Sequence, residues 1–354
     1  MFKVLESFRG AAALLVVLFH MPHWNDILKP TFIVNGYLWV NFFFVLSGFV
    51  IYSKYFNKIN KLNDLVGFCK RRFFRLYPVH LVFLCIFFIL EGFKNYAAIN
   101  YGLTSVNLVG ENPNNIHSLI KNIFFIQSVL PNQQLTYNYP SWSASVEFYT
   151  CLLFACLVLF AGKYKNILGV LIVALLIIFV AQGSLIGYKN FIACIIGFSC
   201  GSLIAYLKIK FPLTDVSKYQ IISLVSIIVF FIYKNESTPD YLIYPLSMVL
   251  ICTVSSDGET LVYKIFNQPV FRYIGAMSYS IYMSHAFVIW CVNQYVRVIL
   301  GRPESVSLGN YYQPMLNETE GIFYCCLTLF FVLLFSALIF NYIEKPIIRW
   351  SRND

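Results

Sequence analysis

The sequence predicts an all-α, polytopic integral membrane protein with about ten transmembrane helices and both termini in the cytoplasm. Three observations predict this fold class. Hydrophobic residues make up 59% of the 354 residues and charged residues only 12%, whereas a soluble domain carries roughly 25% charged residues. The apolar residues gather in runs near the ~20 residues that cross a bilayer as a helix. The basic residues gather in alternate connections between these runs.

Ten apolar runs form the predicted spans, and residues 1–354 are expected to form a single membrane domain. The first run could instead belong to a signal peptide, but the residues after it, Met21-Pro22-His23-Trp24, offer no small-residue cleavage site. We therefore interpret it as a transmembrane helix. The predicted spans are residues 4–22, 35–53, 76–93, 139–160, 167–183, 190–207, 219–233, 241–255, 275–296 and 321–343.

The distribution of Lys and Arg predicts the orientation of these spans. With the N-terminus in the cytoplasm, 18 basic residues fall on the inner side and 7 on the outer side, and Arg9 lies within the first span. Positive charge concentrates on the cytoplasmic side of membrane proteins. The sequence therefore predicts that both termini are inside and that the long connections 94–138 and 297–320 are outside.

The net charge of +10 and the ten cysteines do not indicate another class of protein. A basic charge is typical of nucleic-acid binders, but the chain has no basic, aromatic-rich soluble module, so we expect no nucleic-acid partner. The cysteines lie mostly in apolar runs, with no CxxC pair and no cluster of His and Cys. We therefore expect neither a disulfide framework nor a metal site.

Four ionisable residues lie inside predicted spans, namely Arg9, His20, Glu147 and His285, whereas Glu6, Glu91 and Glu344 sit at span ends and His80 is interpreted as interfacial. A charge at a helix centre costs about 2.5–3.5 kcal/mol on insertion scales, so such residues mark functional sites by default. The alternative for Glu147 is a structural ion pair with an arginine of another helix. Judged by their depth, the four residues could line a path across the bilayer, although the sequence does not decide which helix faces meet.

Arg9 and His20 are 11 residues apart in the first predicted span. At 100° per residue they lie within about 20° of each other around the helix, and roughly 16 Å apart along its axis. One helix face therefore carries a cation toward the cytoplasm and an imidazole toward the outside.

Three arginines precede the third predicted span, in the loop Arg71-Arg72-Phe73-Phe74-Arg75-Leu76-Tyr77-Pro78. Arg72 and Arg75 are three residues apart, a spacing that places two side chains on one helix face. Guanidinium groups suit phosphate, so the cluster could bind a phosphorylated ligand such as coenzyme A. The alternative is that the arginines only anchor the chain at the inner membrane surface.

Six segments resemble the motifs of the acyltransferase-3 family of membrane acyltransferases, in the family's order and over nearly the whole chain. Some positions depart from the usual pattern: Glu6 stands where Asp is common, and Ala144 where Leu is common. These departures remove no catalytic group that the resemblance implies. The matching segments are Phe8-Arg9-Gly10 with His20 (Arg-x10-His), Phe43–Phe49 (FFVLSGF), Arg72–Arg75 (RxxR), Trp142–Tyr149 (WSASVEFY), Ser278–His285 (SYSIYMSH) and Ile343–Pro346 (IEKP).

The resemblance implies an O-acyltransferase of the bacterial cytoplasmic (inner) membrane. Such an enzyme moves an acyl group, usually acetyl from acetyl-CoA, to a hydroxyl of a carbohydrate such as O-antigen, capsule or peptidoglycan. The carbohydrate acceptor can be linked to a lipid. His20 and Arg9 would be catalytic, and Arg72 and Arg75, with Arg71 beside them, would bind the donor. The chain looks most like the stand-alone O-antigen acetylases, because it ends soon after the tenth span and has no esterase-like domain.

We expect His20 to act as general base on the acceptor hydroxyl, because a neutral imidazole is available near neutral pH. Glu147 could orient or stabilise that imidazole, and Arg9 could steady a phosphate or the developing oxyanion. Further candidates lie in the fourth and ninth predicted spans. Those that could line a pore or the acceptor site are His285, Ser143, Trp142 and Tyr279.

Two other interpretations remain to be weighed. The segment Gly197-Phe198-Ser199-Cys200-Gly201 matches the GxSxG pattern of a nucleophile elbow, but it lies in an apolar helical run, where its glycines favour close helix packing instead.

The alternative function is a transporter or flippase for a lipid-linked sugar or a proton-coupled solute, with Arg9, Glu147 and His285 as relay groups. Its signature would be inverted repeats or paired broken helices, and the sequence shows neither.

Overall fold

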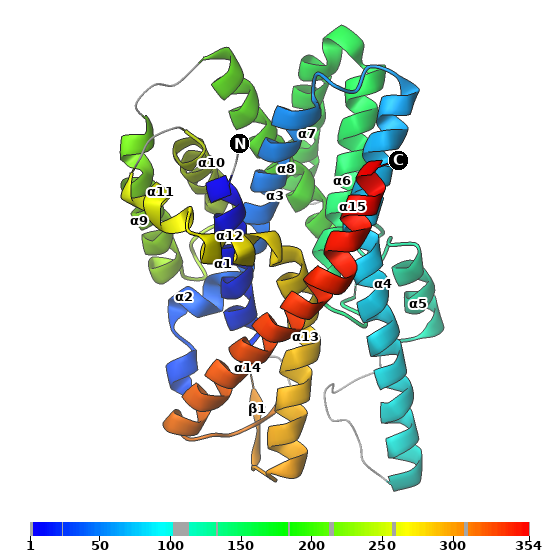
Figure 1. Ribbon diagram of the computed structural model, residues 1–354, viewed down its shortest axis with the longest axis vertical. Coiled ribbons are helices and arrows are strands. Elements are labelled where there is room, and N and C mark those ends of the chain that lie inside the picture. Colours follow the sequence, from blue (N-terminus) through cyan, green and yellow to red (C-terminus); the bar gives the residue numbers. More distant parts are fainter. Residues whose placement is uncertain are drawn as a thin grey trace.

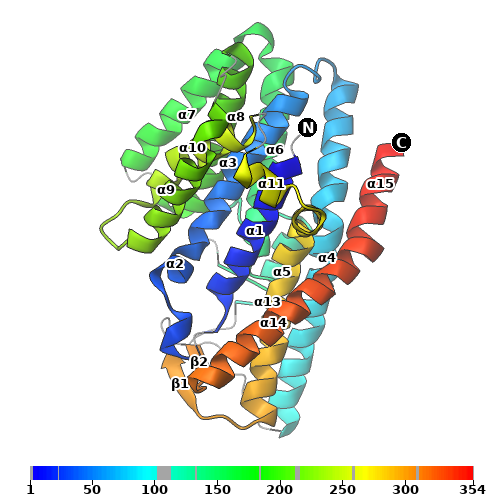
Figure 2. The ribbon, with the colours of Figure 1, turned by 60° about the vertical axis from the view of Figure 1, so that its left-hand side comes forward.

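The computed structural model describes residues 3–22, 24–101, 113–131, 134–182, 185–211, 216–256, 260–307 and 311–353. Its helices are arranged roughly side by side in an elongated bundle (Figures 1 and 2). The helices are α1 (Lys3–His20), α2 (Thr31–Val34), α3 (Trp39–Tyr55), α4 (Leu62–Tyr101), α5 (Ile116–Ile123), α6 (Ser141–Phe160), α7 (Lys165–Ala181), α8 (Lys189–Lys210), α9 (Gln220–Tyr233), α10 (Ile243–Val254), α11 (Leu261–Phe266), α12 (Pro269–Ala276), α13 (Ser278–Gln294), α14 (Glu318–Ile339) and α15 (Lys345–Asn353).

The predicted helical membrane fold is confirmed. Seven helical stretches of the described residues are long and apolar enough to cross a membrane. The predicted number of about ten spans stays a prediction, because α10 and α13 are only 12 and 17 residues long and α1 carries Lys3, Glu6 and Arg9. The seven stretches are Thr31–Tyr55, Leu62–Asn100, Ser141–Phe160, Gly162–Phe179, Ile186–Lys210, Val216–Tyr233 and Glu318–Ser351.

One small β-hairpin departs from the all-α expectation. Strand β1 (Glu304–Ser307) pairs antiparallel with β2 (Tyr311–Pro314), and Glu304 lies opposite Pro314. The hairpin occupies the connection 297–320 that the sequence analysis left without secondary structure. It lies at the end of the bundle away from both chain termini (Figures 1 and 2).

Helix α4 corrects the third predicted span, 76–93. It runs for 40 residues, about 60 Å, from Leu62 to Tyr101, with Pro78 inside it. The segment Arg71–Pro78 is therefore helical and not a loop. The basic residues interrupted the apolar run in the sequence, but Lys and Arg are good helix formers, so they do not interrupt the helix. Membrane helices also tolerate an internal proline.

Two further boundaries differ from the predicted spans. The span expected at 275–296 begins at Ser278, because the helix is interrupted at Met277, which follows the separate short helix α12. The span expected at 321–343 continues into α15 through a wider π-helical turn, Phe340–Glu344. A second π-helical turn, Tyr295–Ile299, follows α13. At the two π-helical turns, as at Met277, the hydrogen bonds of the backbone rather than hydropathy decide where the regular α-helix ends.

The crossing of α3 and α8 confirms the predicted role of the glycines in the GxSxG segment. A Cβ atom added to Gly201 would lie 1.8 Å from the carbonyl oxygen of Val45, and one added to Gly48 would lie 1.9 Å from that of Phe198. Real Cβ atoms do not approach a backbone so closely, so only glycine permits this distance between the two helices. The segment is therefore a packing motif of α8 and not a nucleophile elbow.

Helix α1 lies in the interior of the bundle and positions the candidate site. It packs against α3, α12 and α13. Ala13, Val16 and Val17 of this helix are completely covered. Both chain termini lie toward the same end as the connection between α3 and α4 (Figures 1 and 2). This arrangement agrees with an even number of crossings, whichever side of the membrane the termini occupy.

Candidate functional site

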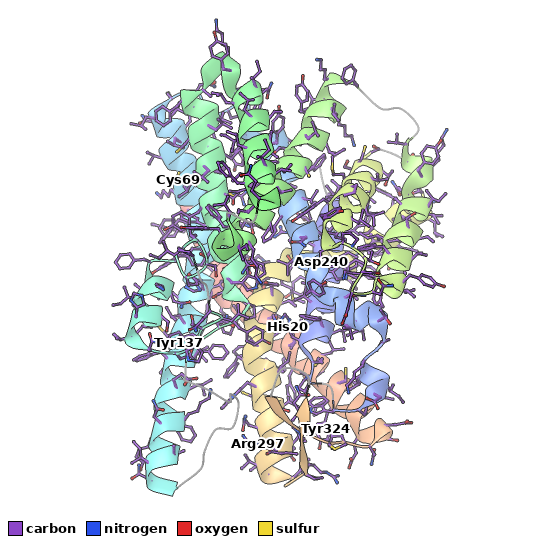
Figure 3. All side chains as sticks on the ribbon, turned by 180° about the vertical axis from the view of Figure 1, so that it is seen from behind. His20, Cys69, Tyr137, Asp240, Arg297 and Tyr324 are labelled. Atoms are coloured by element: carbon purple, nitrogen blue, oxygen red, sulfur yellow. The ribbon has the colours of Figure 1, made fainter. Side chains whose placement is uncertain are left out.

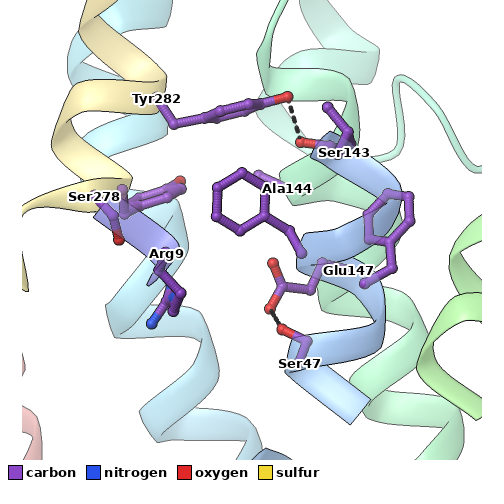
Figure 4. Close-up of a pocket in the computed structure, with 11 residues that line it drawn as sticks. Arg9, Ser47, Ser143, Ala144, Glu147, Ser278 and Tyr282 are labelled. Carbon is purple, nitrogen blue, oxygen red and sulfur yellow. Dashed lines mark hydrogen bonds between the residues drawn. The ribbon is translucent and has the colours of Figure 1, made fainter. Parts of the chain in front are cut away.

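A polar cavity of about 40 Å³ lies between α1, α3, α6 and α13 (Figure 4). Each helix contributes at least one polar side chain, and apolar side chains of α3 fill the spaces between them. A cavity of this size with polar walls can hold a few water molecules. Its lining residues are Arg9, Val40, Phe43, Phe44, Ser47, Ser143, Ala144, Glu147, Ser278, Tyr279 and Tyr282.

Three hydrogen bonds hold the polar wall of the cavity. Ser47 donates to the carboxylate of Glu147 and thereby joins α3 to α6 (Figure 4). Ser143 donates to the hydroxyl of Tyr282 over 2.8 Å, which joins α6 to α13. The hydroxyl of Tyr279 donates to the carbonyl oxygen of Leu76 in α4 over 2.6 Å. The cavity is therefore built by side chains from four helices and a backbone carbonyl of a fifth, and no sequence-local motif forms it.

Arg9 faces Glu147 and Ser47 across this cavity (Figure 4). In the described part of the chain it makes no ion pair within 4.0 Å. The charge of Arg9 interacts electrostatically with a second cation, Arg75 of α4, and with the carboxylates of Glu147, Glu344 and Glu6. Arg9 thus lies among one further cation and three carboxylates, and its guanidinium keeps its donors available for a ligand.

Glu344 contributes to this charge cluster from the π-helical turn between α14 and α15. Its side chain is only 3% exposed, and it accepts a hydrogen bond of 2.5 Å from Ser280 of α13. A buried carboxylate is costly unless hydrogen bonds and opposite charges compensate it. The hydroxyl of Ser280 and the charges of Arg75 and Arg9 offset part of this cost.

His20 lies beyond the cavity, at the other end of α1 (Figure 3). There it meets His285 of α13. His20 Nδ1 lies 3.3 Å from His285 Nε2 and 2.9 Å from the carbonyl oxygen of Val16. The ring of Tyr139 lies 5.0 Å from the ring of His20. Tyr282 connects the two parts of the site, because it lines the cavity and its ring lies 5.8 Å from that of His285.

The structure separates three residues that the sequence analysis combined in one mechanism. Glu147 bonds with Ser47, and in the described part of the chain no hydrogen bond joins it to His20. Arg9 and His20 share α1 but stand 11 residues, about 16 Å, apart along its axis. The side-chain partner of the His20 imidazole is therefore His285, and Arg9 with Glu147 forms a second part of the site, nearer the start of α1.

The three arginines of α4 do not share one environment. The guanidinium of Arg71 lies over the ring of Tyr55, and that of Arg72 lies over the ring of Phe68, at 5.7 and 5.8 Å from the ring centroids. Arg75, one turn further along the helix, acts instead on the charge of Arg9. Of the three, Arg75 is the one whose charge reaches the cavity.

The other candidates divide between the cavity and the helix packing around it. Ser143 and Tyr279 are in the cavity wall, whereas Trp142 packs its ring against Phe44 at 6.0 Å and does not line the cavity. Sequence reasoning did not single out Ser47 and Tyr282. The signals were present: Ser47 is the hydroxyl within an apolar run, and Tyr282 is three residues from both Tyr279 and His285, the spacing of one helix face.

Comparison with known proteins places these residues within a family. Residues 2–341 match the family model described as "Acyltransferase domain". The chain is 26% identical over 339 residues to a "Putative O-acetyltransferase" of Staphylococcus aureus (strain COL), covering 82% of this chain and 51% of that relative. It is 24% identical over 321 residues to "O-acetyltransferase OatA" of Staphylococcus aureus (strain NCTC 8325 / PS 47), with the same coverage. The chain thus spans about half the length of these curated relatives. No solved structure matches it.

Proposed function

The chain belongs to this family of membrane acyltransferases, and on that premise we propose that it transfers an acyl group from acyl-coenzyme A, in the simplest case acetyl-CoA, to a hydroxyl of an envelope carbohydrate. The acceptor we propose is O-antigen or another surface polysaccharide. The observation that carries the proposal is the two-part site. Within the described residues, Arg9 lines a polar cavity without an ion pair at one end, and the Nε2 of His20 has no hydrogen bond at the other.

The cationic part of the site supports a phosphorylated donor. Arginine forks bind phosphate oxygens in pairs, and in a low-dielectric site they hold them strongly. Arg75 and Arg9 supply two such groups close to the cavity, and Arg72 lies one turn before Arg75. The cavity of about 40 Å³ is smaller than a coenzyme A arm. Donor binding in our proposal therefore moves the surrounding helices apart.

The length of the site supports an elongated donor. Arg9 and His20 lie ~16 Å apart along α1, which is too far for both groups to act on the same atom of a substrate. Coenzyme A carries its phosphates and its thioester at opposite ends of a long flexible arm. We therefore assign Arg9 to the phosphate end of the donor and His20 to the thioester, and not Arg9 to the oxyanion.

His20 is suited to act as the general base. The carbonyl oxygen of Val16 can only accept, so its 2.9 Å contact with Nδ1 places the proton of the neutral ring on Nδ1. Nε2, which has no hydrogen-bond partner among the described residues, then takes the proton of the acceptor hydroxyl as its oxygen attacks the thioester carbonyl. The carbon–sulfur bond breaks, and the same proton passes to the coenzyme A thiolate. The products are an ester and a free thiol.

The carbohydrate acceptor is supported by the relatives and by the position of His20. Both relatives reported above are named as O-acetyltransferases. His20 ends α1 on the side away from the chain termini, which the distribution of basic residues assigns to the outside. An acceptor on the outer surface would therefore reach His20 without crossing the bilayer.

The test is acetyl transfer by the purified protein in lipid nanodiscs, with acetyl-CoA as donor and the polysaccharide of the producing cell as acceptor. His20→Ala should lower turnover by about 10²- to 10⁴-fold, the usual cost of losing a general base. His117→Ala, which removes an exposed imidazole of α5, is the control and should keep turnover. If the wild-type protein consumes no acetyl-CoA with any envelope fraction, the proposed function is wrong, and transport of a lipid-linked sugar becomes the function to test.

A further inference from the structure

The contact between His20 and His285 is the feature of the site that the proposed mechanism does not yet use. His285 comes from α13, 265 residues after His20 in the chain, and its side chain is 0% exposed. The ring centroids of the two imidazoles lie 4.9 Å apart, with 39° between the planes. Burial of a polar ring is costly unless a hydrogen bond compensates it. For His285 Nε2, the partner within hydrogen-bonding distance is His20 Nδ1.

The hydrogen-bonding groups around the pair decide which nitrogen carries each proton. Because the carbonyl of Val16 accepts from His20 Nδ1, the nitrogen of His285 that faces this proton must also accept. His285 Nε2 is therefore unprotonated in the neutral pair, and the proton of His285 is on Nδ1. Nδ1 is buried and has no hydrogen bond of normal geometry among the described residues, and the backbone carbonyls of Ile281 and Tyr282 act on this ring.

We propose that His285 is the positioning residue for His20: its Nε2 keeps the proton of neutral His20 on Nδ1 and accepts more strongly from Nδ1 once His20 is charged. This inference rests on the proposed function. While Nε2 holds the proton of the acceptor hydroxyl, Nδ1–H of the imidazolium donates to His285, which spreads the positive charge over two rings. When Nε2 returns its proton to the thiolate, the pair is neutral again, and no further reactant is needed.

The surroundings of the pair favour this assignment over a carboxylate partner. The rings packed against His20 and His285 are uncharged ones, those of Phe19, Tyr139 and Tyr282. Glu147 is bonded to Ser47, and Glu344 is bonded to Ser280. The position that an aspartate holds in a serine-protease triad is thus taken here by a neutral imidazole. A neutral partner fixes the tautomer without placing a second charge in the membrane interior.

Two substitutions at His285 separate positioning from packing. His285→Phe keeps a flat ring but removes the acceptor, and should lower kcat by about 10- to 100-fold while KM for acetyl-CoA changes by less than about 2-fold. The expected loss is below the ~10⁴ seen in the triad, because Val16 still accepts from Nδ1. His285→Gln keeps an acceptor oxygen at a similar reach and should restore kcat to within a few-fold of the wild type.

The control is His80→Gln, which alters another buried histidine, bonded to the carbonyl of Asn122 over 2.9 Å, and should not change kcat. Equal kcat for the wild type and His285→Phe would overturn the positioning role, and so would equal losses in the Phe and Gln variants. A wild-type protein without acetyl transfer would instead overturn the proposed function.

A measurement on the resting protein decides the tautomer without turnover or variants of His285. The chain has 5 histidines, so ¹⁵N labelling of histidine gives a small set of ring signals, and those of His20 are identified by their loss in His20→Gln. We expect a protonated Nδ1 and an unprotonated Nε2. A His20 ring that carries its proton on Nε2 in the neutral state would contradict the proposal even if His285→Phe were unstable.

Discussion

The hydroxyl of Ser143 donates to the hydroxyl of Tyr282 over 2.8 Å, and this bond joins α6 to α13 at the wall of the cavity. Both side chains are buried, with 8% and 7% exposure. The bond holds Tyr282 between the cavity and the ring of His285. The cavity with Arg9 and the pair of His20 and His285 are therefore connected by one tyrosine, Tyr282. The orientation of Tyr282 depends on the hydroxyl of Ser143 in another helix.

Tyr282→Phe should lower the free energy of unfolding by about 0.5–1.5 kcal/mol, because it removes one buried hydrogen bond and keeps the ring. Ser143→Ala should cost a similar amount. Since both changes remove the same bond, the double variant should cost less than the sum of the two. Thermal unfolding of the four proteins in one detergent measures this coupling. Strictly additive losses would show that the bond does not join the helices.

Arg75→Ala should raise KM for acetyl-CoA roughly tenfold or more, since a charge-assisted contact contributes about 1.5–3 kcal/mol. Arg71→Ala is the matched control four residues earlier in α4. The Arg71 guanidinium lies over Tyr55, while Arg75 acts on the charge of Arg9. Steady-state kinetics with varied donor gives the comparison. Wild-type KM values for both variants would mean that the cluster is only a topology anchor.

Gly201→Ala should destabilise the protein by at least about 1–3 kcal/mol, because its Cβ would lie 1.8 Å from the carbonyl oxygen of Val45. Gly92→Ala in α4, where a Cβ would meet nothing within 4 Å, is the control. It should be neutral or up to about 1 kcal/mol more stable, as expected for Gly to Ala in a helix. Fluorescence-detected size-exclusion chromatography after heating measures both. A Gly201→Ala protein as stable as the wild type would contradict the close crossing of α3 and α8.

Reporters of membrane side should find Lys61 and the C-terminus in the cytoplasm and a site within 105–125 outside. The reason is the division of basic residues, 18 against 7. Of this region the structure describes residues 113–125, and residues 105–112 lie outside the described residues. Paired fusions to an enzyme active only in the cytoplasm and one active only outside measure the topology. A cytoplasmic 105–125 would reverse the direction of transfer that we propose.

Much of the fold could be predicted from local patterns. Hydropathy located the helices α6, α8 and α9 to within a few residues, since burial in lipid requires each span to be apolar along its length. Hydropathy failed to locate the start of α4, because charged residues lie inside this helix. The arginines before Pro78 are part of α4. Hydropathy also did not detect the π-helical turn Phe340–Glu344, because such a turn changes the backbone hydrogen bonds but not the hydropathy.

The candidate site was predicted residue by residue but not as an arrangement. Helix periodicity alone placed Arg9 and His20 on one face of α1 and gave their separation. The partners of these residues come from distant helices, and periodicity has no information about them. Glu147 was expected beside His20, yet it is bonded to Ser47, and His285 occupies the place next to the imidazole.

The sequence by itself determined the class of the protein, the family motifs and the residues that are too polar for a membrane helix without a function. These depend on composition and on spacing along one helix. Only the tertiary structure decided that Arg9 faces Glu147 across a cavity and that His20 contacts His285. The physical reason is that helix packing rotates and shifts each helix as a unit. Contacts such as the glycine crossing of α3 and α8 set those rotations, and no single helix contains the information about them.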